Sequence, residues 1–101
     1  MRCITITYQY SGDEKEWRAA IDGFISALNA DTAIAGRFNY QVSVADDGKT
    51  RIHWGRWDSA ETLAHVQLQT YFKTFAAQVG SFSDGGPTVT AANVITRTKS
   101  W

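Results

Sequence analysis

The stretch RFNYQVSVADDGKTRIHWGRW, residues 37–57, contains two segments of alternating side chains on either side of a short turn. In residues 37–45, apolar and aromatic side chains alternate with polar ones, and this period of two is typical of a β-strand. The pair of aspartates before Gly48 favours a type I turn with glycine in the left-handed position. The stretch therefore predicts a β-hairpin that has a bulge at its turn and ends at Trp57.

The pairing of these two strands decides which side chains share a face, because a shift by one residue exchanges the faces. We expect the register that separates apolar from polar side chains. It places two pairs on the apolar face: Val42 with Ile52 and Tyr40 with Trp54. On the polar face it pairs Gln41 with His53, beside Asn39 and Arg51. This face predicts a hydrogen-bonding patch in which His53 is a candidate general base near neutral pH.

The residues before the hairpin predict a strand followed by a helix. Residues 3–10 alternate with period two and are rich in β-branched side chains. Asp13 and Glu16 have the spacing of a capping box. Apolar side chains then recur at helical spacing, which predicts an amphipathic helix over residues 14–29.

The residues after the hairpin predict a second helix and a last strand. Asp58 and Glu61 form another potential capping box, and residues 59–79 have a helical pattern. Residues 83–87 are rich in glycine and predict a loop. Residues 88–98 are rich in β-branched side chains and predict a strand.

The second helix contains a conflict of phase. Leu63 and Val66 lie off the apolar face that starts at Leu68. We therefore expect a kink between Val66 and Leu68. A straight helix would instead place His65 on the apolar face, so the two alternatives give this histidine opposite environments.

The order strand–helix–strand–strand–helix–strand predicts one α+β domain over residues 1–101. This is the ferredoxin-like βαββαβ arrangement, in which a four-stranded antiparallel sheet carries two helices on one face. A chain of 101 residues fits a single domain and can bury one modest core.

Composition excludes several classes of function. Ten basic and ten acidic residues give a formal net charge of zero, which argues against binding to a nucleic-acid backbone. The single cysteine, Cys3, cannot form an internal disulfide, and no apolar stretch approaches the ~20 residues of a membrane span. Two histidines and one cysteine at unrelated positions do not predict a metal site. We expect a soluble, cytoplasmic protein.

The element order, the stretch Trp57–Leu63 and the aromatic end of the second helix at Phe72–Phe75 resemble the antibiotic-biosynthesis-monooxygenase-like family of the dimeric α/β-barrel superfamily. The resemblance implies a homodimer whose two sheets close into a barrel, with a pocket between each sheet and its helices. It also implies a small oxygenase that acts on an aromatic or quinone-like molecule without metal, flavin or other cofactor.

This chain departs from the family at two helical positions. The family often has a histidine nine residues after the aromatic residue that closes the third strand, where this chain has Val66. Another position that is often histidine holds Tyr71. His65 is one residue early, which on a helix turns its side chain by about 100°, so the family's role is not transferred to it.

The candidate site residues follow from face and chemistry. His53 and His65 are candidate catalytic bases. Asn39 and Gln41 are candidate orienting groups for a polar part of the substrate. Aromatic side chains form the candidate walls of a substrate pocket: Tyr8, Tyr40, Trp54, Trp57 and Phe72.

Simpler interpretations stand beside these assignments. The polar sheet face is also consistent with a solvated face, because antiparallel sheets often leave one face polar. The aromatic residues are also consistent with an ordinary core. The missing family histidine favours a non-enzymatic homodimer that binds a small molecule or has a structural role. A closed aromatic cavity containing a histidine would favour the enzyme, and a cavity filled by its own aromatic residues would favour the binding protein.

Overall fold

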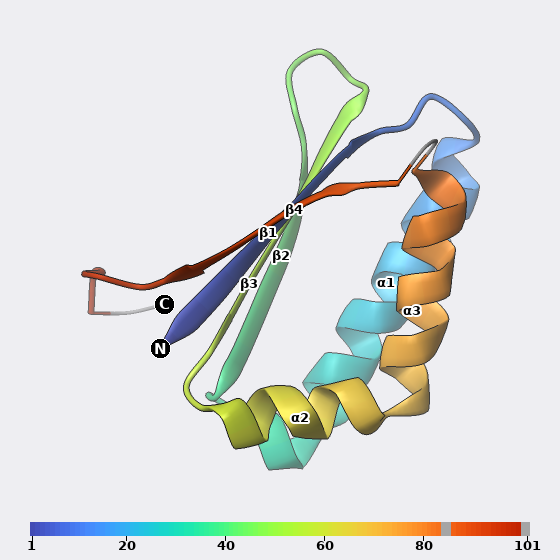
Figure 1. The fold of residues 1–101 in the computed structure, drawn as a ribbon. Coiled ribbons are helices and arrows are strands. Elements are labelled where there is room, and N and C mark those ends of the chain that lie inside the picture. The colour runs from blue at the N-terminus through green and yellow to red at the C-terminus, as the bar shows by residue number, and fades with distance from the viewer. Residues whose placement is uncertain (84–85, 100–101) are drawn as a thin grey trace.

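The computed structural model describes residues 1–83 and 86–99 and contains a four-stranded sheet and three α-helices (Figure 1). The strands are β1 (Arg2–Gln9), β2 (Phe38–Val44), β3 (Thr50–Trp57) and β4 (Thr88–Asn93). The helices are α1 (Glu14–Ala30), the 3-10 turn η1 (Thr32–Ile34), α2 (Ala60–Leu68) and α3 (Thr70–Phe82). This order confirms the predicted ferredoxin-like α+β fold, with the second helix divided in two.

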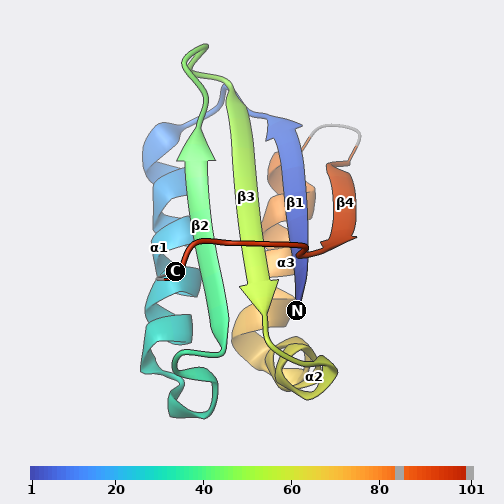
Figure 2. The ribbon, with the colours of Figure 1, turned by 90° about the vertical axis from the view of Figure 1, so that its left-hand side faces the viewer.

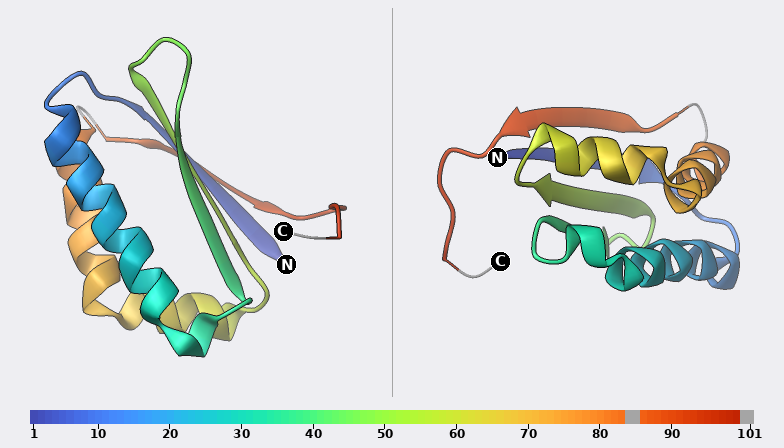
Figure 3. Two further views of the ribbon diagram at one scale, coloured as in Figure 1. Left: turned by 180° about the vertical axis from the view of Figure 1, so that it is seen from behind. Right: turned by 90° about the horizontal axis from the view of Figure 1, so that it is seen from below.

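The sheet has the strand order β2-β3-β1-β4, and all neighbouring strands are antiparallel (Figure 2). Helices α1 and α3 lie side by side on one face of the sheet (Figures 1 and 2). Helix α2 lies across one end of the space between these helices and the sheet, as the view from behind in Figure 3 shows. The predicted layer of helices on a single sheet face is therefore confirmed.

Helix α1 supplies much of the core. Asp13 caps its first turn, accepting hydrogen bonds from the backbone N–H groups of Lys15 at 2.8 Å and Glu16 at 3.3 Å. Its buried side chains recur every three or four residues and so form one stripe that faces the core: Trp17, Ala20, Ile21, Phe24 and Leu28. The ring of Phe24 stacks on Phe75 of α3 with centroids 3.8 Å apart, which joins the two helices.

The predicted register of the β2–β3 hairpin is wrong by one residue. Tyr40 lies opposite Gly55, Gln41 opposite Trp54, and Val42 opposite His53. As a result, His53 faces the helices, whereas Trp54 lies on the open face of the sheet and lines a groove there.

The cause of the shift is a turn one residue longer than expected. The Ala45 N–H donates to the carbonyl of Thr50 at 2.8 Å, so four residues lie between this pair. The carboxylate of Asp47 accepts hydrogen bonds from the backbone N–H groups of Lys49 and Thr50, both at 2.8 Å. These bonds and one from the Thr50 hydroxyl hold the Asp47 pKa at about 2. Gly48 has φ 73°, so its predicted left-handed conformation is confirmed.

Helices α2 and α3 meet at Gln69, whose ψ of 145° interrupts the helical backbone. The predicted break is confirmed, but it lies just after the expected interval and leaves Leu68 exposed.

The cap of α2 also differs from the prediction. Ser59, and not Asp58, accepts the hydrogen bond from the Thr62 N–H, while the Asp58 carboxylate accepts one from the Thr62 hydroxyl.

The last strand is shorter than predicted, since β4 ends at Asn93 and not at Thr98. Residues 94–99 instead cross the open face of the sheet (Figure 2). Of the predicted loop at 83–87, residues 84 and 85 lie outside the described residues. Within residues 1–83 and 86–99, no helix has the length and apolar character needed to cross a membrane.

Candidate small-molecule site

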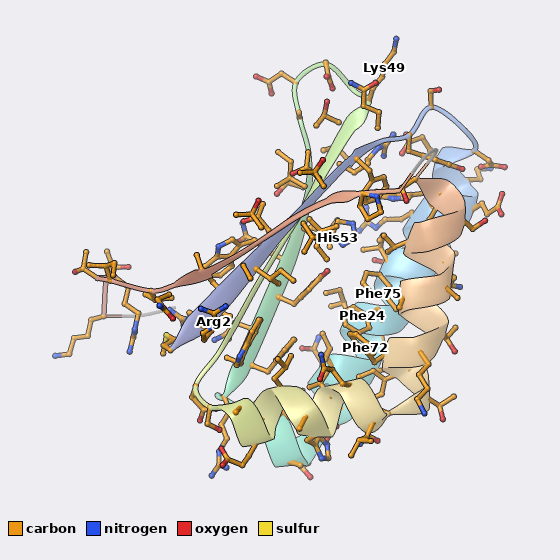
Figure 4. All side chains as sticks on the ribbon, viewed as in Figure 1. Arg2, Phe24, Lys49, His53, Phe72 and Phe75 are labelled. Carbon is orange, nitrogen blue, oxygen red and sulfur yellow. The ribbon has the colours of Figure 1, made fainter. Side chains whose placement is uncertain are left out.

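A cavity of about 310 Å³ lies between the helix-covered face of the sheet and helices α2 and α3. Figure 4 shows Phe24, Phe72 and Phe75 in this space, with His53 approaching from the sheet. The described lining contains no charged side chain, and most of it is apolar: Ile4, Ile6, Phe24, Phe38, Tyr40, Trp57, Leu63, Gln67, Phe72, Phe75, Ala76, Val79, Gly80 and Pro87. Such a lining with a few polar groups is typical of a site for a small, flat organic molecule.

A chain of hydrogen bonds runs behind one wall of this cavity. The Trp17 indole N–H donates to the Tyr8 hydroxyl oxygen at 2.9 Å. That oxygen lies 2.8 Å from Nε2 of His53, and Nδ1 of His53 lies 2.9 Å from the Tyr40 hydroxyl. The four side chains come from α1, β1, β3 and β2, so only the folded chain brings them together.

The strand registers explain why the two tyrosines contact opposite sides of one imidazole. Ile6 of β1 and Val42 of β2 lie directly opposite His53. Tyr8 and Tyr40 are each two residues from those partners, on the same face, where long side chains reach a diagonal neighbour. Both hydroxyl groups therefore converge on the imidazole ring.

Burial determines the protonation states of the histidine and the two tyrosines in this hydrogen-bonded chain. It lowers the pKa of His53, which is 0% exposed, to about 4, so the imidazole is neutral at pH 7. Burial also raises the pKa of Tyr8 and of Tyr40, so both phenols keep their protons. The chain therefore holds a neutral imidazole between two neutral phenols.

The buried guanidinium of Arg51 lies beside Trp17, at the end of the hydrogen-bonded chain that is farther from the cavity. The Arg51 guanidinium lies 4.4 Å from the centre of the Trp17 ring and forms an ion pair with Glu14. It also donates to the backbone carbonyl of Tyr10 at 2.9 Å. These partners compensate for its burial, so Arg51 stabilises the start of α1 against β3.

The structure brings some of the predicted site residues together and separates others. Trp57 and Phe72 line the cavity, and their role as walls of a substrate pocket stays a prediction. His53 and Tyr8 lie behind the lining and connect with it through Tyr40.

Three predicted site residues lie elsewhere. Trp54 and Gln41 line the groove on the open face of the sheet, and Asn39 lines a surface cleft between β2 and the end of α1. The expected patch of His53 with Asn39 and Gln41 is therefore not formed. The shift of register by one residue moved His53 to the opposite face from these amides.

His65 belongs to a separate polar cluster at the outer side of α2. Its Nε2 lies 2.8 Å from Oδ2 of Asp31, and the Tyr71 hydroxyl donates to the same oxygen at 2.9 Å. Hydrogen bonds from His65 and then Tyr71 lower the pKa of Asp31, while burial raises that of Tyr71 to about 12. His65 is partly exposed and does not line the cavity.

Sequence reasoning did not connect Trp17 and Tyr40 with His53. The helical periodicity identifies Trp17 as a core residue, and the strand alternation puts Tyr40 on the helix-covered face. No local pattern shows that Tyr40 bonds directly to this histidine or that Trp17 is linked to it through Tyr8, since these contacts depend on the hairpin register. The cavity residues Leu63 and Gln67 were missed because their positions depend on how α2 is oriented after its break from α3.

Acidic, cysteine and histidine side chains do not gather into a metal site: across residues 1–83 and 86–99 no group of three or more is placed to hold an ion.

Comparison with solved structures supports the fold. Rv0793 from Mycobacterium tuberculosis aligns with a TM-score of 0.79 and 18% identity, over 97% of this chain and 98% of that one. A variant of SnoaB, a cofactor-independent oxygenase from Streptomyces nogalater, aligns with a TM-score of 0.75 and 9% identity over 95% and 94%. A structure described as an antibiotic biosynthesis monooxygenase aligns with a TM-score of 0.75 and 8% identity over 95% and 100%.

The class that these comparisons define is the ferredoxin-like fold of the antibiotic biosynthesis monooxygenases, as the sequence predicts. At identities below 20% the likeness concerns the fold. No protein-family model and no curated protein matches the chain.

Proposed function

We propose that this chain is a small cofactor-independent oxygenase that binds a planar aromatic or quinone-like molecule in the cavity between the sheet and helices α2 and α3. The observation that carries the proposal is the combination of an apolar, aromatic cavity with one tyrosine hydroxyl backed by a neutral, buried histidine. The same fold in SnoaB, a cofactor-independent oxygenase, is consistent with this chemistry.

The substrate that suits this chemistry is a ketone with an acidic methylene group between aromatic rings. Its enolate gives electrons to O₂. One oxygen atom becomes a new carbonyl, and the second leaves as water with the two methylene hydrogens, so no other reductant is required. The protein contributes a dry cavity formed by Trp57, Phe72 and Phe75, and the Tyr40 hydroxyl as a hydrogen bond to the oxygen on which negative charge develops.

Of the two candidate bases, only His53 is connected with the cavity, through Tyr40. His65 is bonded to Asp31 outside it. We therefore propose that His53 acts on the reaction by orienting the Tyr40 hydroxyl.

The proposal is tested with anthrone, a tricyclic ketone of this type, by following O₂ consumption and the absorbance of the quinone product. The wild-type chain should accelerate conversion over buffer, and Tyr40→Phe should reduce the rate by about tenfold or more, in line with the loss of one oxyanion-stabilising donor. Tyr71→Phe is the matched control, since it removes a hydroxyl outside the cavity. Conversion no faster than in buffer would refute the oxygenase.

A second candidate is a protein that binds the same class of molecule without converting it. One observation favours it: His53 does not line the cavity and lies beneath Phe75, with ring centroids 5.5 Å apart. Saturable binding of anthrone without O₂ consumption would identify this alternative.

We also propose that the chain forms a homodimer through the open face of its sheet. This face carries a groove of about 630 Å³ with a largely apolar lining that includes Ile52 and Trp54. Ile95, from the segment that crosses the face, is 90% exposed. A second copy that covers this face would remove these side chains from water.

A further inference from the structure

In the hydrogen-bonded chain beside the cavity, each group donates to the next in a fixed order. Trp17, the first member, determines this order. An indole nitrogen can only donate, so the Trp17 N–H must give its hydrogen bond to the oxygen of Tyr8. This leaves Tyr8 with one proton of its own and a single further partner among the described residues, Nε2 of His53.

The middle member, His53, must donate from one ring nitrogen and accept at the other. It is fully buried, and neither of its hydrogen-bond partners is a carboxylate. A neutral imidazole has one N–H and one lone pair. Therefore one of the two tyrosines donates to His53 and the other accepts from it.

Two arrangements satisfy this condition, and they differ in which tyrosine keeps a free proton. If Tyr40 donates to Nδ1, then Nε2–H donates to Tyr8, and the Tyr8 proton has no acceptor among the described residues. Tyr8 is only 5% exposed, and an unmet buried donor costs more than a typical hydrogen bond contributes. If Tyr8 donates to Nε2, then Nδ1–H donates to Tyr40, and the free proton is that of Tyr40.

Tyr40 is the member of the chain that lines the cavity, so its free proton can meet a ligand there. The ring is held in place on several sides. Its edge contacts with Phe24, His53 and Phe75 have interplanar angles of 86°, 90° and 85°. It also lies against Gly55, where an added Cβ would come within 3.0 Å of the ring.

We propose that Tyr40 is the specificity-determining hydrogen-bond donor of the cavity, and that Trp17 and Tyr8 are positioning residues that act through His53 to keep the Tyr40 proton available. The ligand class is a flat, uncharged molecule with an acceptor oxygen. Carboxylates are disfavoured because the described lining offers them no cation. The inference uses the cavity of the proposed function, but it does not depend on turnover.

The first test reads the tautomer of His53 directly. Nitrogen-15 NMR of the ring nitrogens at pH 7 should show a protonated Nδ1 and an unprotonated Nε2. The chain has two histidines, so the His65→Gln variant leaves His53 as the only one and assigns its signals. A protonated Nε2 in the otherwise unmodified chain would overturn the inference, and this result requires no ligand and no activity.

The second test uses two ligands of matched shape, 1-tetralone with a carbonyl oxygen and tetralin without one. Their affinities are measured by quenching of tryptophan fluorescence. Tyr40→Phe should weaken tetralone binding by about two- to tenfold, the effect of one neutral hydrogen bond, and leave tetralin binding unchanged.

Tyr71→Phe is the matched control for the second test, since its hydroxyl bonds to Asp31 outside the cavity, and it should bind both ligands as the wild type does. Equal weakening of both ligands in Tyr40→Phe would overturn the inference, as would unchanged tetralone binding or the absence of binding of either ligand to the wild type. Failure of anthrone conversion alone would refute only the oxygenase.

Discussion

At the scale of single residues, the site depends on two positions of β3 that the sequence presents without a distinguishing motif. His53 occupies the centre of the hydrogen-bonded chain, and Gly55 leaves room for the ring of Tyr40 on the neighbouring strand. A side chain at residue 55 would displace that ring, because the added Cβ would lie closer to it than ordinary contacts allow. These two residues therefore control where the Tyr40 hydroxyl lies.

The burial of His53 predicts a pH-dependent stability. Because its pKa is about 4 in the folded chain and about 6.5 in an unfolded one, the unfolded state binds more protons between these values. The free energy of unfolding should fall by about 3 kcal/mol as the pH falls from 6.5 to 4, through this residue alone. Chemical denaturation at a series of pH values measures this dependence.

The non-titrating variant His53→Gln is the control for that measurement. Carboxylates make the free energy of unfolding depend on pH in both proteins. The difference between the wild-type and variant curves is therefore the contribution of His53. The same slope in both proteins between pH 6.5 and 4 would contradict the neutral, buried state of His53.

At the scale of elements, the break at Gln69 determines what α2 and α3 do. It turns α2 across the end of the cavity, so that Leu63 becomes part of the wall while α3 supplies Phe72. The Asp31 carboxylate, at the end of α1, joins the two helices by accepting hydrogen bonds from His65 and Tyr71. We therefore interpret His65 as a residue that connects helices.

This interpretation predicts the behaviour of His65→Ala. The loss of one hydrogen bond to a charged partner at a partly exposed site should lower the free energy of unfolding by about 1 kcal/mol. Tetralone affinity and anthrone conversion should remain at wild-type values. A large loss of conversion in a folded His65→Ala protein would instead support His65 as the base.

At the scale of the whole molecule, the two faces of the sheet have different roles. The helix-covered face forms the cavity and buries the histidine, while the other face is crossed only by residues 94–99 among the described parts of the chain. Because the formal net charge is zero, two copies of the chain do not repel each other through their net charge when they pair through the open face.

The dimer proposal predicts a mass of twice that of the chain in analytical ultracentrifugation at micromolar concentration. The double variant Ile52→Asp with Ile95→Asp should shift the protein to a monomer, because it places charges on the surface that is expected to become buried. Leu68→Asp is the control. That leucine is 74% exposed at the end of α2, away from the sheet, so the dimer should persist. A monomeric wild type would rule out the dimer.

The sequence predicted the elements better than it predicted the site. Alternation and capping residues located the strands and helices to within a few residues, except for β4, and the phase conflict before Leu68 indicated the break between α2 and α3. Among the site residues, Trp57 and Phe72 line the cavity, while their part in substrate binding stays a prediction. The patch around His53 was wrong because the turn at Asp47 added one residue, which moved this side chain to the other face.

What the sequence determined by itself is local: strands with period two, helices with one apolar stripe, and the order of elements that defines this fold. Only the tertiary structure decided which face His53 occupies and that Trp17, Tyr8 and Tyr40 meet around it. The physical reason is that the hairpin register depends on hydrogen bonds between the Asp47 side chain and the backbone of its own turn. A change of one residue there exchanges every side chain of β3 between the two faces of the sheet.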